Sequence, residues 1–216
     1  MFTSNPRWRW AIVFTVAVII IQGLLGISHL VLPNLWLPAS AASVQSRGQV
    51  DWVDPHKYNQ EWFDAARAGR QDITMALIDA GYPINTVNKA GYTALVLATY
   101  HGYLAEVVDL LSRGADPCIP DRNGNTALMG ALFKGEIPIA MQLLDKCPID
   151  QSNNSGQTAL SFAALFGRLD FLPELTQRGA DPNHIDAQGK STLSIVLEQG
   201  NHQAAAALLH VGARRS

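Results

Sequence analysis

The sequence predicts an all-α repeat solenoid, a stack of about five helix-turn-helix units with turn fingers, preceded by one N-terminal transmembrane or signal helix. The main observation is a short phrase, Gly-x-Thr/Ser-Ala/Thr-Leu, that occurs four times. Its last residues are Leu95, Leu128, Leu160 and Leu193, so the phrase advances by 33, 32 and 33 residues. A second phrase, clearest at Gly114-Ala115-Asp116, keeps the same period. A constant period of this length indicates units that bury their apolar faces only against their neighbours.

Composition narrows the classes of partner and of scaffold. The 216 residues include 16 basic and 18 acidic side chains and no basic run, so nothing favours a nucleic-acid partner. The two cysteines, Cys118 and Cys147, are too few and too far apart in sequence for a zinc site. We expect both to be free thiols, because stacked helices lie about 8–10 Å apart. A disulfide needs Cα atoms within about 7 Å.

The N-terminal segment predicts a membrane helix. Residues 11–32 contain no charged side chain and, as a helix, would extend about 33 Å, close to the thickness of a bilayer core. Arg7 and Arg9 precede this run, and the next positive charge is Arg47. This bias predicts that residues 1–10 stay in the cytoplasm and that the C-terminal domain crosses the membrane. The prediction is a single-pass inner-membrane protein of a bacterium, with its C-terminal domain in the periplasm.

A cleaved signal peptide is the alternative. Ala39-Ser40-Ala41 fits the small-x-small cleavage rule, which would leave a soluble periplasmic or secreted protein after cleavage near Ala41. The run is longer than an ordinary signal peptide core, which favours a retained signal anchor. Residues 33–58 read as a flexible tether, because prolines, glycine and an Ala/Ser stretch interrupt any amphipathic pattern.

The repeat domain is predicted over residues 59–213, in units of approximately 55–87, 88–120, 121–152, 153–185 and 186–213. Each unit has a turn, a first helix opened by a hydroxyl residue that can cap free N–H groups, and a second apolar helix. The capping residues are Thr93, Thr126, Thr158 and Ser191. Glycines that can adopt a left-handed conformation end the first helices at Gly102, Gly135, Gly167 and Gly200.

This pattern resembles the ankyrin repeat family over roughly residues 55–213. The copy at 91–120 matches best, with Ala98, Gly102, Glu106-Val107-Val108 and Gly114-Ala115-Asp116. The family's histidine after leucine is absent from every copy, where Val96, Met129, Ser161 and Ser194 stand instead. We therefore expect the usual hydrogen bond between neighbouring loops to be missing. The resemblance implies a stack of helix pairs that binds other proteins.

No residue pattern indicates an enzyme. No two histidines have metal-ligand spacing, and the sequence has neither a Gly-rich phosphate loop nor a nucleophile elbow. We expect no catalytic residue, metal, cofactor or small-molecule substrate.

The resemblance also implies where a partner binds. Ankyrin proteins generally use the turn tips and the solvent-facing ends of the first helices, which line a concave groove. The matching positions here that we expect to contact a partner are Tyr92, Tyr100, His101, Arg122, Asn125, Phe133, Lys134, Leu165, Phe166 and Lys190. The aromatic members are favoured as interface anchors.

The sequence thus predicts a non-enzymatic protein-binding module, exposed outside the cytoplasm, that binds a protein partner through the concave groove. Ankyrin proteins with N-terminal export signals imply two more specific alternatives. One is an immunity or inhibitor protein against a delivered toxin, and the other is an accessory protective factor for a periplasmic enzyme.

Overall fold

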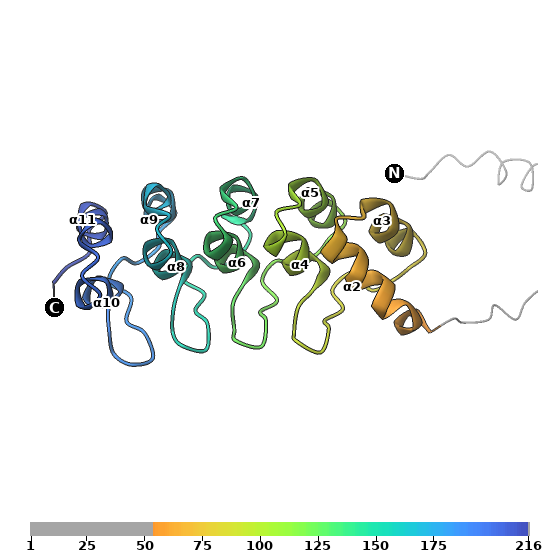
Figure 1. Cartoon of the computed structure of the whole chain (residues 1–216), viewed down its shortest axis with the longest axis horizontal. Coiled ribbons are helices and arrows are strands. Elements are labelled where there is room, and N and C mark those ends of the chain that lie inside the picture. The colour runs from red at the N-terminus through yellow and green to blue at the C-terminus, as the bar shows by residue number, and fades with distance from the viewer. Residues whose placement is uncertain (1–53, 216) are drawn as a thin grey trace, which may run out of the picture. The chain divides into compact units, whose positions relative to one another are not determined.

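The structure, a computed structural model, describes residues 54–215. These residues form five successive helix pairs (Figure 1). A 3-10 helix, η1 (Pro55–Tyr58), precedes the first pair, α2 (Asn59–Ala68) and α3 (Gln71–Asp79). The middle pairs are α4 (Ala94–Tyr100) with α5 (Leu104–Ser112) and α6 (Ala127–Lys134) with α7 (Ile137–Leu143). The last are α8 (Ala159–Leu165) with η2 (Leu169–Phe171) and α9 (Leu172–Gln177), then α10 (Thr192–Glu198) with α11 (His202–His210).

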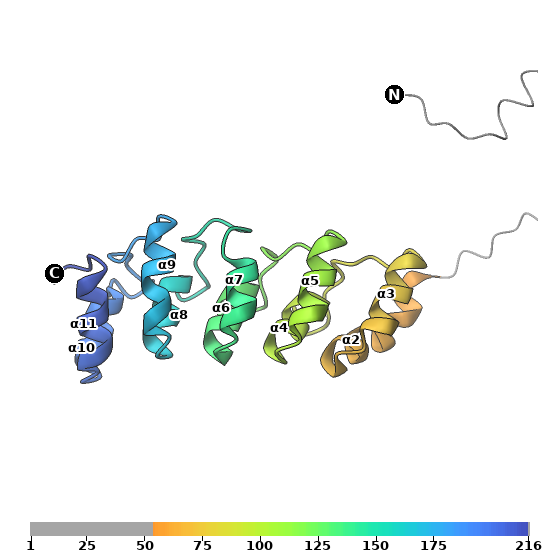
Figure 2. The same ribbon diagram turned by 90° about the horizontal axis from the view of Figure 1, so that it is seen from above.

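The pairs stack into two rows, as the sequence predicts. The first helices α2, α4, α6, α8 and α10 form one row, and the second helices form an outer row beside it (Figures 1 and 2). Long finger-like turns extend from the first helices on the side away from the outer row (Figure 1). The fingers and the first helices together therefore define one face of the stack.

Hydroxyl caps begin the first helices α4, α6, α8 and α10, which confirms the prediction from the repeated phrase. The side chains of Thr93, Thr126 and Thr158 accept hydrogen bonds from backbone N–H groups three residues ahead, at 3.2, 3.4 and 3.4 Å. Ser191 does the same at 3.2 Å. These bonds satisfy N–H groups that a helix leaves free at its first turn.

The fingers are held by side-chain turns and by bonds between neighbouring fingers. Asp121 Oδ1 accepts from the backbone N of Asn123 at 2.8 Å and of Asn125 at 2.9 Å, and the equivalent residue of the other fingers is bonded in the same way. Neighbouring fingers are joined where Asn154 N donates to Asn123 O at 2.9 Å and Ala187 N donates to Ser155 O at 3.0 Å. Backbone bonds thus link the fingers although the family's histidine is absent.

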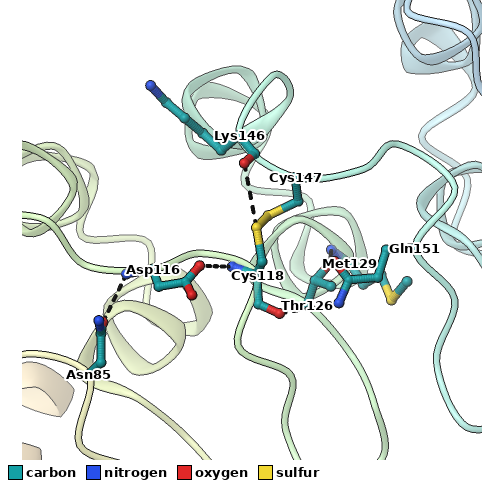
Figure 3. The surroundings of a disulfide bond; sticks show 8 residues. All are labelled: Asn85, Asp116, Cys118, Thr126, Met129, Lys146, Cys147 and Gln151. Atoms are coloured by element: carbon teal, nitrogen blue, oxygen red, sulfur yellow. Dashed lines mark hydrogen bonds between the residues drawn. A yellow bond between two sulfur atoms is a disulfide. The ribbon is translucent and has the colours of Figure 1, made fainter.

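The expectation of two free thiols is wrong. Cys118 and Cys147 form a disulfide with Cα atoms 5.5 Å apart (Figure 3). Both cysteines lie outside the helices, Cys118 in the loop after α5 and Cys147 in the turn after α7, so the spacing of helix axes does not apply to them. The backbone N of Cys118 donates to Asp116 Oδ1 at 2.9 Å, and Gln151 Nε2 donates to the Cys118 carbonyl at 3.2 Å. These bonds fix the loop beside the disulfide.

The predicted membrane location also needs correction. Within residues 54–215, no helix combines the length and the apolar character needed to cross a bilayer. This finding contradicts the predicted single-pass inner-membrane protein. The predicted spanning segment, residues 11–32, lies outside the described residues.

Candidate protein-binding groove

Four aromatic side chains form a row across the face made by fingers and first helices. The ring centroids of Tyr92 and Tyr100 are 6.0 Å apart, and those of Tyr100 and Phe133 are 6.3 Å apart. Phe133 meets Phe166 edge to face at 4.7 Å. The row, which we call the aromatic row, therefore joins the second, third and fourth repeats. Rings at these separations attract one another through their quadrupoles.

The two phenylalanines are the exposed part of the aromatic row. Phe133 is 43% exposed and Phe166, at the C-terminal end of α8, is 39% exposed. Phe133 lies near the end of α6, next to Leu132, which points into the core and is fully buried. Large apolar side chains that remain in water are candidates for burial by a partner.

The two tyrosines are partly buried and pack against the hydrophobic core. Burial, together with the nearby negative charge of Asp121, raises the pKa of Tyr100. Its hydroxyl therefore stays protonated at ordinary pH and can donate a hydrogen bond. Leu165, which the sequence placed in the groove, is also partly buried against the core.

Two residues that the sequence reasoning missed position the aromatic row. Gly130 lies beneath Tyr100, where a β-carbon would stand 2.8 Å from Cε2 of the ring. Arg168, from the next repeat, donates from Nε to the Leu132 carbonyl at 3.1 Å and from Nη2 to the Phe133 carbonyl at 3.3 Å. Arg168 thus fixes the C-terminal end of α6 from which Phe133 projects. For Gly130, the sequence offers one signal of a special role, because glycine is unusual inside a helical pattern.

Polar residues predicted for the groove divide into two groups. Asn125 and Lys190 are engaged within the stack. Asn125 Oδ1 accepts from Asn153 Nδ2 at 2.8 Å, and Lys190 Nζ lies 2.5 Å from Glu198 Oε2. His101, Arg122 and Lys134 are exposed at the finger and helix-end positions, and the His101 ring stacks on Tyr103 with centroids 5.9 Å apart.

A hollow of about 440 Å³ lies at the N-terminal end of this face. It is bounded on one side by α2, including Phe63, Asp64 and Arg67, and on the other by the first finger, including Val87 and Lys89. Its walls are mainly apolar. The structure thus provides a recess that continues the face beyond the aromatic row.

No arrangement in the part of the chain that the structure describes suits metal binding. Within residues 54–215, no three His, Cys, Asp or Glu side chains come together as a metal site would require. Glu106 of α5 is a buried carboxyl, 1% exposed, whose oxygens have no hydrogen-bond partner in the described part. Burial raises the pKa of Glu106 to about 7. This residue lies in the outer row, apart from the aromatic row.

Comparisons with known proteins agree with the architecture. A family model described as "Ankyrin repeats (3 copies)" matches residues 100–186, and one described as "Ankyrin repeats (many copies)" matches residues 63–111. The chain is 27% identical over 189 residues to YahD of Escherichia coli, named as an ankyrin repeat protein, covering 69% of this chain and 94% of YahD. It is 33% identical over 93 residues to Protein HOS4 of Saccharomyces cerevisiae, covering 43% of this chain and 8% of that protein.

The repeated helix pairs, the capped first helices and the family matches define this chain as a repeat protein built for contact with other macromolecules. It belongs to the ankyrin repeat family, whose members are generally non-enzymatic modules for protein–protein interaction.

Proposed function

We propose that this chain binds a protein partner through the face formed by its fingers and first helices, with Phe133 and Phe166 as the central anchors. The further contacts in this proposal come from the second and third repeats and are Tyr92, Tyr100, His101, Arg122 and Lys134. The predicted repeat domain, residues 59–213, is the binding unit in this proposal.

The observation that supports the proposal is the exposure of two contacting phenylalanine rings on one face. A solvent-exposed apolar ring gains free energy when a partner excludes water from it, at about 25 cal/mol per Å² of apolar area. Phe133 and Phe166 are fixed by their contact with each other and by the Arg168 bonds to the end of α6. Rings that are already fixed lose little conformational freedom on binding.

Affinity capture with matched variants tests this assignment. The full chain, tagged at its C-terminus, is used to capture proteins from a detergent lysate of the source organism, and quantitative mass spectrometry compares the variants. Phe133→Ala with Phe166→Ala should lower the melting temperature by only a few degrees and abolish capture of the partner. Removal of an anchor residue from an interface commonly costs about 2 kcal/mol or more, roughly a thirtyfold change in affinity.

The control removes similarly exposed apolar side chains from the outer row. Val108 of α5 is 41% exposed and Met141, in α7, is 44% exposed. Val108→Ala with Met141→Ala should capture the partner as well as the parent does. Capture that survives the phenylalanine substitutions but is lost with the outer-row pair would move the binding site to the second helices. Equal capture by the parent and both variants would contradict the proposal, because neither apolar pair would then be needed for binding.

A further inference from the structure

The charged residues along the groove do not balance one another. Lys89 and Arg122 lie on the first two fingers, and Lys134 is the last residue of α6, one position after Phe133. All three side chains are exposed, and within residues 54–215 none of them makes an ion pair. Arg122 also lies close over the backbone of Gly91 in the neighbouring finger, with its Cγ near that glycine.

Most carboxylates near the same face have partners within the stack. Glu136 is half-buried against Gly102 at the end of α4 and makes no ion pair within residues 54–215. Asp64 accepts from Arg67 at 2.7 Å, and Glu198 pairs with Lys190. Asp121 and its counterpart Asp186 accept the backbone N–H groups of their own turns.

Asp121 and Asp186 keep their negative charge, but Asp121 is buried and Asp186 is half-buried, as is Glu136. The exposed charges beside the aromatic row that lack an ion-pair partner are therefore the positive ones of Lys89, Arg122 and Lys134.

The distribution of this charge is uneven along the stack. The corresponding finger positions of the last two repeats are Asn154 with Ser155 and Ala187 with Gln188, which are uncharged. The exposed unpaired cations of this face thus lie on the second and third repeats. The recess between α2 and the first finger, which contains Lys89, opens at the same end.

We propose that the groove recognises an acidic polypeptide segment, which places an apolar side chain against Phe133 and Phe166 and carboxylates against Lys134, Arg122 and Lys89. This inference rests on the proposed function, since it names the chemistry of the partner for the same face. Arginine suits the recognition of an acidic segment, because its planar guanidinium can hold a carboxylate through two parallel hydrogen bonds.

A nucleic acid is the other polymer that combines rings with negative charge, and the surface fits it less well. A nucleic acid binds through many cations that follow its regular phosphates. The described face offers three exposed Lys or Arg side chains without an ion pair, on two repeats, and the whole chain has a net charge of −2. A polypeptide needs only a few matched carboxylates beside an apolar anchor.

Selection from a random peptide library displayed on phage, with the immobilised full chain as bait, tests the inference. Selected peptides should contain an aromatic or leucine residue flanked by Asp or Glu. Arg122→Glu with Lys134→Glu should lower the affinity for a selected synthetic peptide by about tenfold or more, which corresponds to about 1.4 kcal/mol of binding free energy. Binding should also weaken as salt rises from about 0.05 to about 0.5 M, because exposed charges are screened.

The matched control is Lys146→Glu, which reverses an exposed charge in the turn after α7, and it should bind like the parent. Selected peptides that require Phe133 and Phe166 but are neutral or basic would contradict the inference of an acidic segment. They would leave the proposed function standing. Peptides unaffected by the phenylalanine substitutions would contradict the proposed function itself. The inference of an acidic segment would also be contradicted if no peptide were enriched, or if a single-stranded oligonucleotide bound more tightly than the selected peptides.

Discussion

Gly130 and Tyr100 are in direct contact across two repeats, and the glycine sets how deeply the tyrosine ring lies. A β-carbon on Gly130 would come within 2.8 Å of Cε2 of the ring, closer than such atoms approach. Gly130 is also an interior residue of α6, where alanine is favoured over glycine by about 1 kcal/mol. Helix propensity and the tyrosine contact therefore act in opposite directions at this position.

A double-mutant cycle separates the two effects. In a Tyr100→Ala background, Gly130→Ala should raise the free energy of unfolding by about 1 kcal/mol, because the steric conflict is gone. In the parent, the same substitution should raise it less or lower it. Urea unfolding of the four proteins measures the coupling. An identical gain in both backgrounds would show that the ring moves aside without cost.

Neighbouring residues of α6 should respond very differently to truncation. Leu132 is fully buried, and Leu132→Ala should lower the free energy of unfolding by about 2–5 kcal/mol, because it leaves a cavity. Phe133 is 43% exposed, and Phe133→Ala should cost about 1 kcal/mol, mainly through the lost ring contacts. Chemical denaturation of the two single variants provides the test. Similar losses for both would place the Phe133 ring in the core and remove it as a binding anchor.

Glu106 should make stability depend on pH. Its pKa rises from 4.5 to about 7, chiefly because burial disfavours the charged carboxylate, with the negative charge of Asp109 adding to this effect. The folded state therefore holds a proton that the unfolded state has lost between these values. Stability should fall as pH rises from about 4.5 to about 7 and then level off, with a total of roughly 3 kcal/mol for this group.

Glu106→Gln should remove this dependence and raise stability at about pH 8, since the amide needs no charge to be buried. Melting temperatures of the Glu106→Gln variant and of the parent, measured across this pH range, provide the test. Glu61→Gln, which changes an exposed carboxylate of α2, is the control and should follow the parent curve. A Glu106→Gln curve parallel to that of the parent would contradict the assignment.

The disulfide should contribute substantially to stability. It joins residues separated by 29 positions, and a cross-link of this span stabilises by roughly 3–4 kcal/mol in the chain-entropy description. Cys118→Ser with Cys147→Ser should lower the free energy of unfolding by that amount. A reducing agent should lower the stability of the parent and leave the double variant unchanged. Two titratable thiols in the denatured, unreduced parent would show that the bond is absent.

The regular parts of this molecule could be predicted from the sequence because each follows from a local, repeated pattern. The period placed the five helix pairs, and the hydroxyl residues such as Thr93 and Thr126 marked where the first helices begin. The exposed positions of Phe133 and Phe166 followed from the same register. Their role in binding stays a prediction.

What could not be predicted depends on contacts between repeats at positions where the pattern is broken. Cys147 stands where the best-matching copy has Gly114, and its approach to Cys118 depends on loop paths rather than on helix spacing. The reach of Arg168 to the end of α6 likewise depends on a side chain that the period does not specify, since Tyr103 and Glu136 stand at that place in the two preceding repeats. Period and helix geometry contain no information about either contact.

The bond between Cys118 and Cys147 also changes how the molecule responds to a pulling force. When a stack of repeats is stretched from its ends, the units unravel and the chain lengthens by up to about 3.3–3.6 Å per released residue. The segment between the two cysteines, a separation of 29 positions, cannot contribute while the bond is intact. The fully extended oxidised chain should therefore be shorter than the reduced chain by roughly 100 Å.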